Sequence, residues 1–322
     1  MTAAHGDVAP LLGAWAIGAC SEEETRLVLE HLPECAVCAE ETRLLARAAP
    51  VLHGGGRLPP AGLRASVLSG AFERRRPVVR LPEHVAPYAA QVSMLDALLA
   101  ELTEPDWTTN VIYDWNVQDV VAHLGATDRL LAEQLTEQDA PDVDARTAAE
   151  IAFERGRRPE ETRGSWREHA QELCARLKEA TPSTVHIPFP MRLENAVVAR
   201  AFETWVHATD IAAAVGRSLP APLPEHLHAI ADLGVRSLPA ALAMRGVETG
   251  GQARLLLEGP GGGDWLLPLG GDGPNVTIRL DVLDFCMLAA DRRDPTKVEA
   301  TIEGDSPLAR HLLSAASAFA GP

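Results

Sequence analysis

One stretch decides the fold of the first part of the chain: Glu30-His31-Leu32-Pro33-Glu34-Cys35-Ala36-Val37-Cys38. It places a histidine and two cysteines close together, beside a proline that ends a predicted helix. Imidazole and thiolate groups at this spacing are typical of a tetrahedral zinc site. The fourth ligand is either His5 or Cys20, and we favour His5 because Cys20 lies beside a helix cap. The alternative is two buried thiols without a metal.

Residues 1–50 form a small helical unit around this stretch. The apolar pattern predicts one helix from Asp7 to Ala19. A capping box of Ser21 and Glu24 predicts that the next helix starts near Glu22. A unit of this size cannot bury a sufficient core alone, so a metal would stabilise it.

Composition limits the class of protein. The chain has 322 residues, a length that predicts two or three domains. Its hydrophobic fraction of 46% is high enough for folded cores. Its formal charge of -16 argues against direct nucleic-acid binding, which needs a basic surface. Five cysteines, an odd number, argue against a secreted disulfide framework. No apolar run is long enough to span a membrane, so we expect a cytoplasmic protein without membrane contact.

Residues 51–84 form a predicted linker that is rich in glycine, proline and arginine. An amphipathic helix within it presents Leu63, Val67 and Phe72 on one side. This helix is either a solvated connector or a segment that binds a partner protein.

The N-terminal motifs resemble the zinc-binding anti-sigma domain of actinobacteria. The resemblance rests on Leu12 to Ala19, on the acidic run from Ser21 to Glu24, and on the spacing of His31, Cys35 and Cys38. It implies a domain that regulates transcription by binding a sigma factor of the extracytoplasmic-function type. In redox-sensing members a thiol pair oxidises and zinc leaves. With the favoured His5 as the distal ligand, that disulfide cannot form.

Residues 85–218 read as a helical bundle with a second metal site. His123 lies within one predicted helix, and Glu203 and His207 lie four residues apart on another, so both project from one face. Two imidazoles and a carboxylate suit Zn²⁺ or another divalent ion, with a coordination position left open. Asp119 and Asp210 are candidates to orient the two histidines. The alternative is a core histidine and a helical ion pair.

Residues 219–322 read as a small α+β domain. Strands are predicted at 253–257, 264–269, 276–280 and 298–302, with helices near 224–245, 281–290 and the C-terminus. The fold class expected for the whole chain is therefore mainly α.

Three further motifs resemble the mycothiol-dependent maleylpyruvate isomerase family across about residues 85–322. They are Trp115-x-Val117-x-Asp119-Val120-Val121-Ala122-His123, then Glu203-x-Trp205-Val206-His207-Ala208-x-Asp210, and finally Leu280 to Cys286 followed by Arg292-Arg293-Asp294-Pro295. The resemblance implies a DinB-like four-helix bundle and a sterol-carrier-like α+β domain. It also implies that His123, Glu203 and His207 are the metal ligands, and that Arg293 or Arg292 contacts substrate.

The same resemblance implies chemistry with mycothiol, a low-molecular-weight thiol. A metal-bound thiolate is a nucleophile at neutral pH. In the isomerase it adds to a conjugated double bond, lets the bond rotate and leaves.

These observations give three hypotheses. The first is a zinc-binding anti-sigma regulator whose body senses or uses a thiol. The second is an active mycothiol-dependent isomerase or S-transferase whose zinc-binding head is an interaction or stability module. The third is a metal-binding scaffold without catalysis. The basic linker helix favours the first hypothesis, and the complete ligand triad favours the second.

Overall fold

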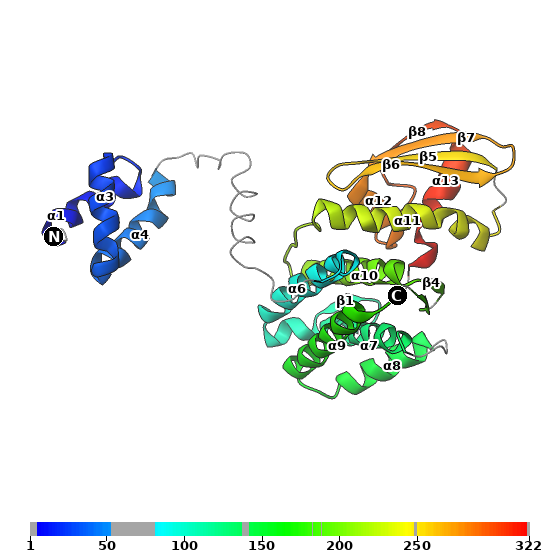
Figure 1. The fold of residues 1–322 in the computed structure, drawn as a ribbon, viewed down its shortest axis with the longest axis horizontal. Helices are drawn as coiled ribbons and strands as arrows, with labels where there is room; N and C mark the ends of the chain where they lie inside the picture. Colours follow the sequence, from blue (N-terminus) through cyan, green and yellow to red (C-terminus); the bar gives the residue numbers. More distant parts are fainter. Residues whose placement is uncertain are drawn as a thin grey trace. The chain divides into compact units, whose positions relative to one another are not determined.

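The structure, a computed structural model, describes residues 5–52, 81–136, 142–181, 183–187, 189–247 and 250–320. The chain divides into two compact units, Met1–Val78 and Val79–Pro322 (Figure 1). The described residues are mainly helical, with one four-stranded sheet near the C-terminus. Among the helices in these ranges, none is long and apolar enough to cross a membrane.

Short helices build the N-terminal unit: α1 (His5–Val8), η1 (Ala9–Leu11), α2 (Leu12–Ala16), α3 (Glu22–His31), η2 (Leu32–Glu34) and α4 (Ala36–Leu52). The single helix predicted from Asp7 to Ala19 is wrong, because the structure divides this segment into three pieces. Pro10 lies in the first turn of η1, where its missing N–H interrupts the helical hydrogen-bond pattern. The capping box at the start of α3 is confirmed, with the Ser21 N–H donating to Glu24 Oε2 at 2.8 Å.

The buried core of the N-terminal unit is small. Among residues 5–45, whose side chains the structure describes, the fully buried apolar ones are Val8, Leu12, Val28 and Cys38. So small an apolar core contributes little free energy of folding, which is why a bound metal would matter there.

The helices of the bundle are η3 (Glu83–Val85), α6 (Ala86–Ala100), η4 (Glu104–Thr108), α7 (Val117–Gln134), α8 (Val143–Glu154), α9 (Pro159–Glu179) and α10 (Leu193–Ala214). All of them lie within the helical region predicted for residues 85–218, apart from η3, which begins at Glu83. α7 is buried along almost its whole length, since it packs against both α8 and α9. α10 packs against α6 and also contacts α7, which brings their side chains together.

Two short hairpins in this region were not predicted. They are β1 (Asn110–Ile112) with β2 (Trp115–Asn116), and β3 (Thr184–His186) with β4 (Pro190–Arg192). The first hairpin leads directly into α7. Asn116 is the N-cap of that helix and accepts a hydrogen bond from the Asp119 N–H at 3.0 Å.

The C-terminal region begins with α11 (Pro224–Met244) and continues with β5 (Gly251–Glu258), β6 (Gly263–Gly270), β7 (Asn275–Asp281), α12 (Val282–Ala289), β8 (Ala300–Gly304) and α13 (Ser306–Ala315). The four predicted strands are confirmed. They are ordered β6-β5-β7-β8, with β5 and β7 parallel and the other pairs antiparallel. Alternate residues of β5 and β7 are buried, because α11, α12 and α13 lie on one side of the sheet (Figure 1).

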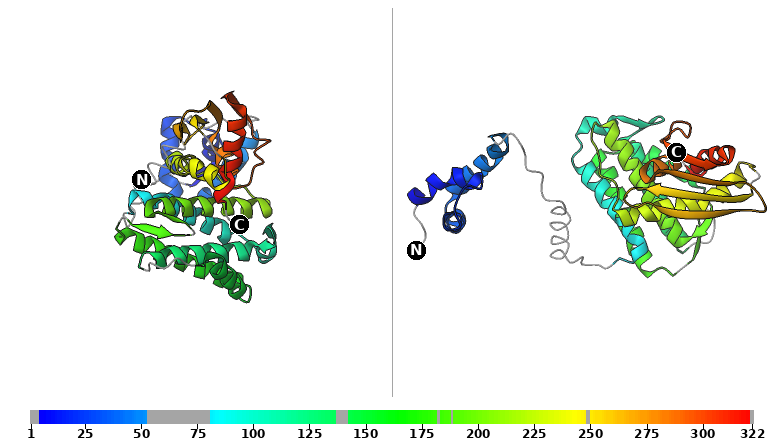
Figure 2. Two further views of the ribbon diagram at one scale, coloured as in Figure 1. Left: turned by 90° about the vertical axis from the view of Figure 1, so that its right-hand side faces the viewer. Right: turned by 90° about the horizontal axis from the view of Figure 1, so that it is seen from above.

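α11 lies between the sheet and the helical bundle, as Figures 1 and 2 both show. Trp205 and Val206 of α10 belong to the same hydrophobic cluster as the inner face of the sheet. The predicted division near residue 218 falls between α10 and α11, inside the unit Val79–Pro322.

Candidate metal centres

His123 is buried near the middle of α7, with 5% of its surface exposed. The Trp115 ring from the preceding hairpin lies beside it, at 5.1 Å between ring centroids. His123 Nδ1 has no hydrogen-bond partner among the described residues. Packing rather than a hydrogen bond at that nitrogen therefore orients the ring.

Glu203 and His207 lie one turn apart on α10 and face His123. Glu203 Oε1 is 2.7 Å from His123 Nε2, and the two imidazole rings are 5.3 Å apart at an angle of 80°. One ligand atom from each of the three residues lies within 4.8 Å of the others. The structure thus brings the three predicted ligands together from two facing helices.

The protonation states of these groups suit a metal site. Burial lowers the pKa of His123, and this effect outweighs the nearby Glu203 carboxylate. Burial alone would raise the pKa of Glu203, but Arg200 and then His123 hold it well below the usual value. At neutral pH the site therefore offers a carboxylate and a neutral imidazole, the forms that bind Zn²⁺ and similar ions.

A buried arginine and a buried aspartate support Glu203, and neither was predicted from the sequence. Arg200, which is 4% exposed, donates from Nε and Nη2 to Asp128 Oδ1 at 3.0 and 2.9 Å. Its Nη1 donates to Glu203 Oε2. The sequence feature that could have revealed Arg200 is its position one turn before Glu203 on a largely apolar helix.

The predicted role of Asp119 as a partner of His123 is wrong. Its carboxylate accepts hydrogen bonds from the Asn116 N–H at 3.1 Å and from Arg155 Nε and Nη2 at 2.7 and 3.0 Å. Asp119 lies in the first turn of α7, where unsatisfied backbone donors attract a carboxylate. It therefore caps the helix instead of reaching one turn along it.

Asp210 does lie beside His207, as predicted. Its Oδ2 is 3.4 Å from His207 Nδ1 and accepts a hydrogen bond from Arg292 Nη2 at 2.8 Å. This contact at Nδ1 is electrostatic and does not meet hydrogen-bond geometry. It leaves the opposite ring nitrogen, Nε2, for an ion.

Arg292, rather than Arg293, is the arginine connected to the triad. The Arg293 side chain is 59% exposed and lies 3.4 Å from Asp284. No contact between Arg293 and the triad occurs among the residues that the structure describes, so its predicted catalytic role has no structural support. Arg292 reaches the triad through Asp210.

A second group of ligands forms in the N-terminal unit. Ligand atoms of His5, His31, Cys35 and Cys38 lie within 4.8 Å of one another. His5 Nδ1 is 3.5 Å from Cys35 Sγ and 3.2 Å from Cys38 Sγ. Cys20, the alternative fourth ligand, instead directs its thiol to the Leu11 carbonyl at 3.7 Å. The structure therefore favours the two-histidine, two-cysteine set.

The two thiols of this group differ in acidity. A hydrogen bond from the Cys38 backbone, followed by one from His5, lowers the pKa of Cys35 to about 6. Burial and then Cys35 raise the pKa of Cys38. The Cys35 thiolate is the form that binds zinc.

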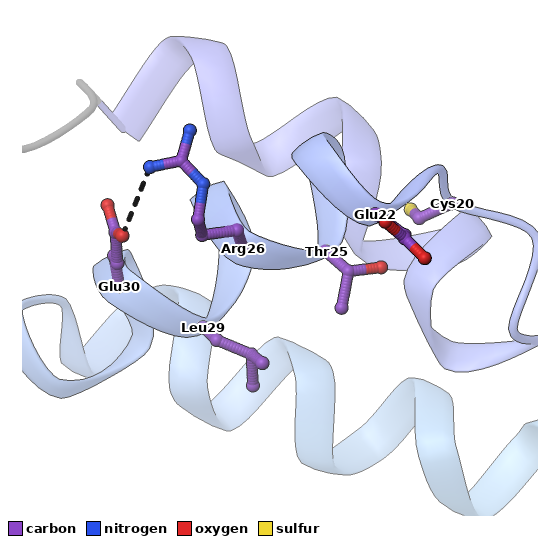
Figure 3. Close-up of a pocket in the computed structure, with 6 residues that line it drawn as sticks. All are labelled: Cys20, Glu22, Thr25, Arg26, Leu29 and Glu30. Atoms are coloured by element: carbon purple, nitrogen blue, oxygen red, sulfur yellow. Dashed lines mark hydrogen bonds and ion pairs between the residues drawn. The ribbon is translucent and has the colours of Figure 1, made fainter.

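An open hollow of about 450 Å³ lies near α3 in the N-terminal unit. Figure 3 shows its lining side chains: Cys20, Glu22, Thr25, Arg26, Leu29 and Glu30. None of the four clustered ligands is among them. The predicted partner-binding residues Leu63, Val67 and Phe72 lie outside the described residues.

Residues 88–212 match the sequence profile of the mycothiol maleylpyruvate isomerase N-terminal domain, a range that contains His123, Glu203 and His207. An uncharacterized protein of Mycobacterium tuberculosis, in strains CDC 1551 / Oshkosh and H37Rv, is 30% identical to this chain over 253 residues. The match covers 74% of this chain and 95% of the relative. The chain belongs to the family that carries the mycothiol maleylpyruvate isomerase N-terminal domain.

Two crystal structures resemble this family member in fold. One is the mycothiol-dependent maleylpyruvate isomerase, at a TM-score of 0.52 and 17% identity, covering 70% of this chain and 93% of that one. The other is a histidine-to-alanine mutant of it, at a TM-score of 0.52 and 16% identity, covering 69% and 93%. At this level of identity the likeness concerns the fold alone.

Proposed function

We propose that residues 81–320 form a metal-dependent enzyme that uses a low-molecular-weight thiol, mycothiol or a close analogue, as an isomerase or thiol S-transferase. The observation that carries this proposal is the convergence of His123, Glu203 and His207, two buried imidazoles and one ionised carboxylate. Membership of the family and the shared fold support it.

The chemistry follows from what these residues can hold. A divalent ion there supplies a positive charge that stabilises a bound thiol as its thiolate, the nucleophilic form. Asp210 orients His207, Arg200 holds Glu203, and Trp115 packs against His123. These contacts keep the three donors in place before any ligand arrives.

The finer fold assignments belong to the same proposal. We assign α6, α7, α9 and α10 to a DinB-like four-helix bundle, since these helices pack on one another and carry the ligands on facing sides. We assign the region from α11 onward to a sterol-carrier-like domain.

The same proposal places the protein in the cytoplasm. Free thiols at all five cysteines suit that compartment, where thiols stay reduced.

A titration of the Co²⁺-substituted full chain with 2-mercaptoethanol tests the function. Cys35→Ser and Cys38→Ser are present throughout, so that the N-terminal unit contributes no sulfur signal. We expect a sulfur-to-cobalt absorption band, which His207→Ala abolishes and His311→Ala, a change at an exposed histidine of α13, leaves intact. Absence of the band in the parent protein would overturn the proposal.

The N-terminal cluster supports a second candidate function, a zinc module that binds a sigma factor. The comparisons support the thiol-dependent alternative better than this regulatory hypothesis, so the enzyme takes first place. Cys35→Ser should remove about one zinc equivalent from the full chain. Co-purification with the host's sigma factors, lost on chelation, would support the regulatory role, and unchanged zinc content in Cys35→Ser would refute the site.

A further inference from the structure

Two buried or half-buried ion pairs flank the candidate centre on α7 and α10. Arg200 pairs with Asp128, which is 0% exposed, and Arg292 pairs with Asp210. Each pair contributes a positive and a negative charge. Glu203 therefore carries the one negative charge that these pairs leave uncompensated.

The Arg200 side chain also makes the two carboxylate oxygens of Glu203 different. Nη1 of Arg200 donates a hydrogen bond to Oε2, while Oε1 lies 2.7 Å from His123 Nε2. An arginine fork held on its other side by a buried aspartate has little freedom to move away. Oε1 is thus the oxygen left for an ion, and Glu203 is restricted to a one-oxygen ligand.

Charge balance then limits what can complete the centre. A divalent ion bound to the one carboxylate of Glu203 leaves a net charge of about +1 in the site. An uncompensated charge among buried groups costs free energy. One monoanionic ligand neutralises it. A neutral ligand leaves the charge uncompensated, and a dianion reverses it.

We propose that Arg200, neutralised by Asp128, is a positioning residue that restricts Glu203 to one ligand oxygen and sets the charge so that the centre takes a single monoanion, a thiolate. This inference rests on the proposed function, because it assumes a divalent ion held by His123, Glu203 and His207.

The experiment alters charge with little change in shape. Arg200→Gln, Asp128→Asn and the double variant are made in the full chain carrying Cys35→Ser and Cys38→Ser, and each is loaded with Co²⁺. Affinity for 2-mercaptoethanol is measured by visible absorption at fixed pH. Imidazole, a neutral ligand, is titrated as the control.

We expect Arg200→Gln to weaken thiol binding on the order of tenfold, because the site gains negative charge. Asp128→Asn should strengthen thiol binding, because it leaves the arginine uncompensated. The double variant restores the original net charge, so its thiol affinity should return close to that of the parent. Imidazole affinity should change much less in all three variants.

A purely structural role predicts a different pattern: all three variants lose thiol and imidazole affinity together, and the double variant is the weakest. That pattern would overturn the inference. If Arg200→Gln does not fold, Asp128→Asn and the double variant still decide, since removing both members of a buried pair is often tolerated. Failure of the parent protein to bind Co²⁺ at the triad would refute the proposed function instead.

Discussion

Replacing Asp119 by alanine tests whether its carboxylate caps helix α7 or supports the metal ligand His123. The carboxylate is 2% exposed, accepts from the Asn116 N–H and pairs with both Nε and Nη2 of Arg155. Loss of an N-terminal capping interaction costs about 1 kcal/mol. Because the Arg155 side chain is 51% exposed, its ion pair adds only about 0.5–1 kcal/mol. The expected loss of unfolding free energy is therefore about 2 kcal/mol.

Urea unfolding of the full chain, followed by tryptophan fluorescence, measures this loss, and a thermal melt should shift by about 4–8 °C for a unit of this size. Metal affinity at the triad should remain within about twofold of the parent, because the Asp119 carboxylate bonds to Asn116 and Arg155 and not to the His123 ring. Asp210→Asn is the matched control, and it should lower metal affinity about 10–100-fold. If Asp119→Ala instead weakened metal binding tenfold at unchanged stability, the helix-cap assignment would be refuted.

Two further predictions use other parts of the chain. In zinc-free protein, iodoacetamide should alkylate Cys35 half-maximally near pH 6, because its pKa is lowered to about 6 by hydrogen bonds from Cys38 and His5. Burial raises the pKa of Cys174 to about 11, so this thiol should stay unmodified at pH 8. Peptide mass spectrometry measures the labelling of each cysteine. Equal labelling of Cys35 and Cys174 would contradict both the lowered pKa of Cys35 and the raised pKa of Cys174. Phe285→Ala should cost about 3–5 kcal/mol in the urea assay, since the ring is 1% exposed within the sheet-side core, and a cost below about 1 kcal/mol would contradict its assignment to that core.

Much of the architecture was predictable from local patterns. The long helices follow from apolar periodicity, and the strands of the C-terminal sheet from short apolar runs between turns. The i, i+4 spacing of Glu203 and His207 fixed their common face without tertiary information. The spacing of His31, Cys35 and Cys38 likewise located the N-terminal ligands.

The missed features depend on contacts between distant segments or on competition between local partners. Arg200 and Asp128 are 72 residues apart, and no local pattern pairs them. The parallel pairing of β5 with β7 skips over β6, so it is not visible in either strand's sequence. Asp119 is one turn from His123, yet the free N–H groups at the helix start and Arg155 compete for it.

Metal stoichiometry tests the central claim most directly. Elemental analysis of the full chain, after loading with Zn²⁺ and removal of unbound metal, should give about two equivalents per chain. Cys35→Ser with Cys38→Ser should leave about one equivalent, held by His123, Glu203 and His207, and adding His207→Ala should leave none. A parent protein with a single equivalent that the cysteine variants abolish, and that His207→Ala does not change, would contradict the account.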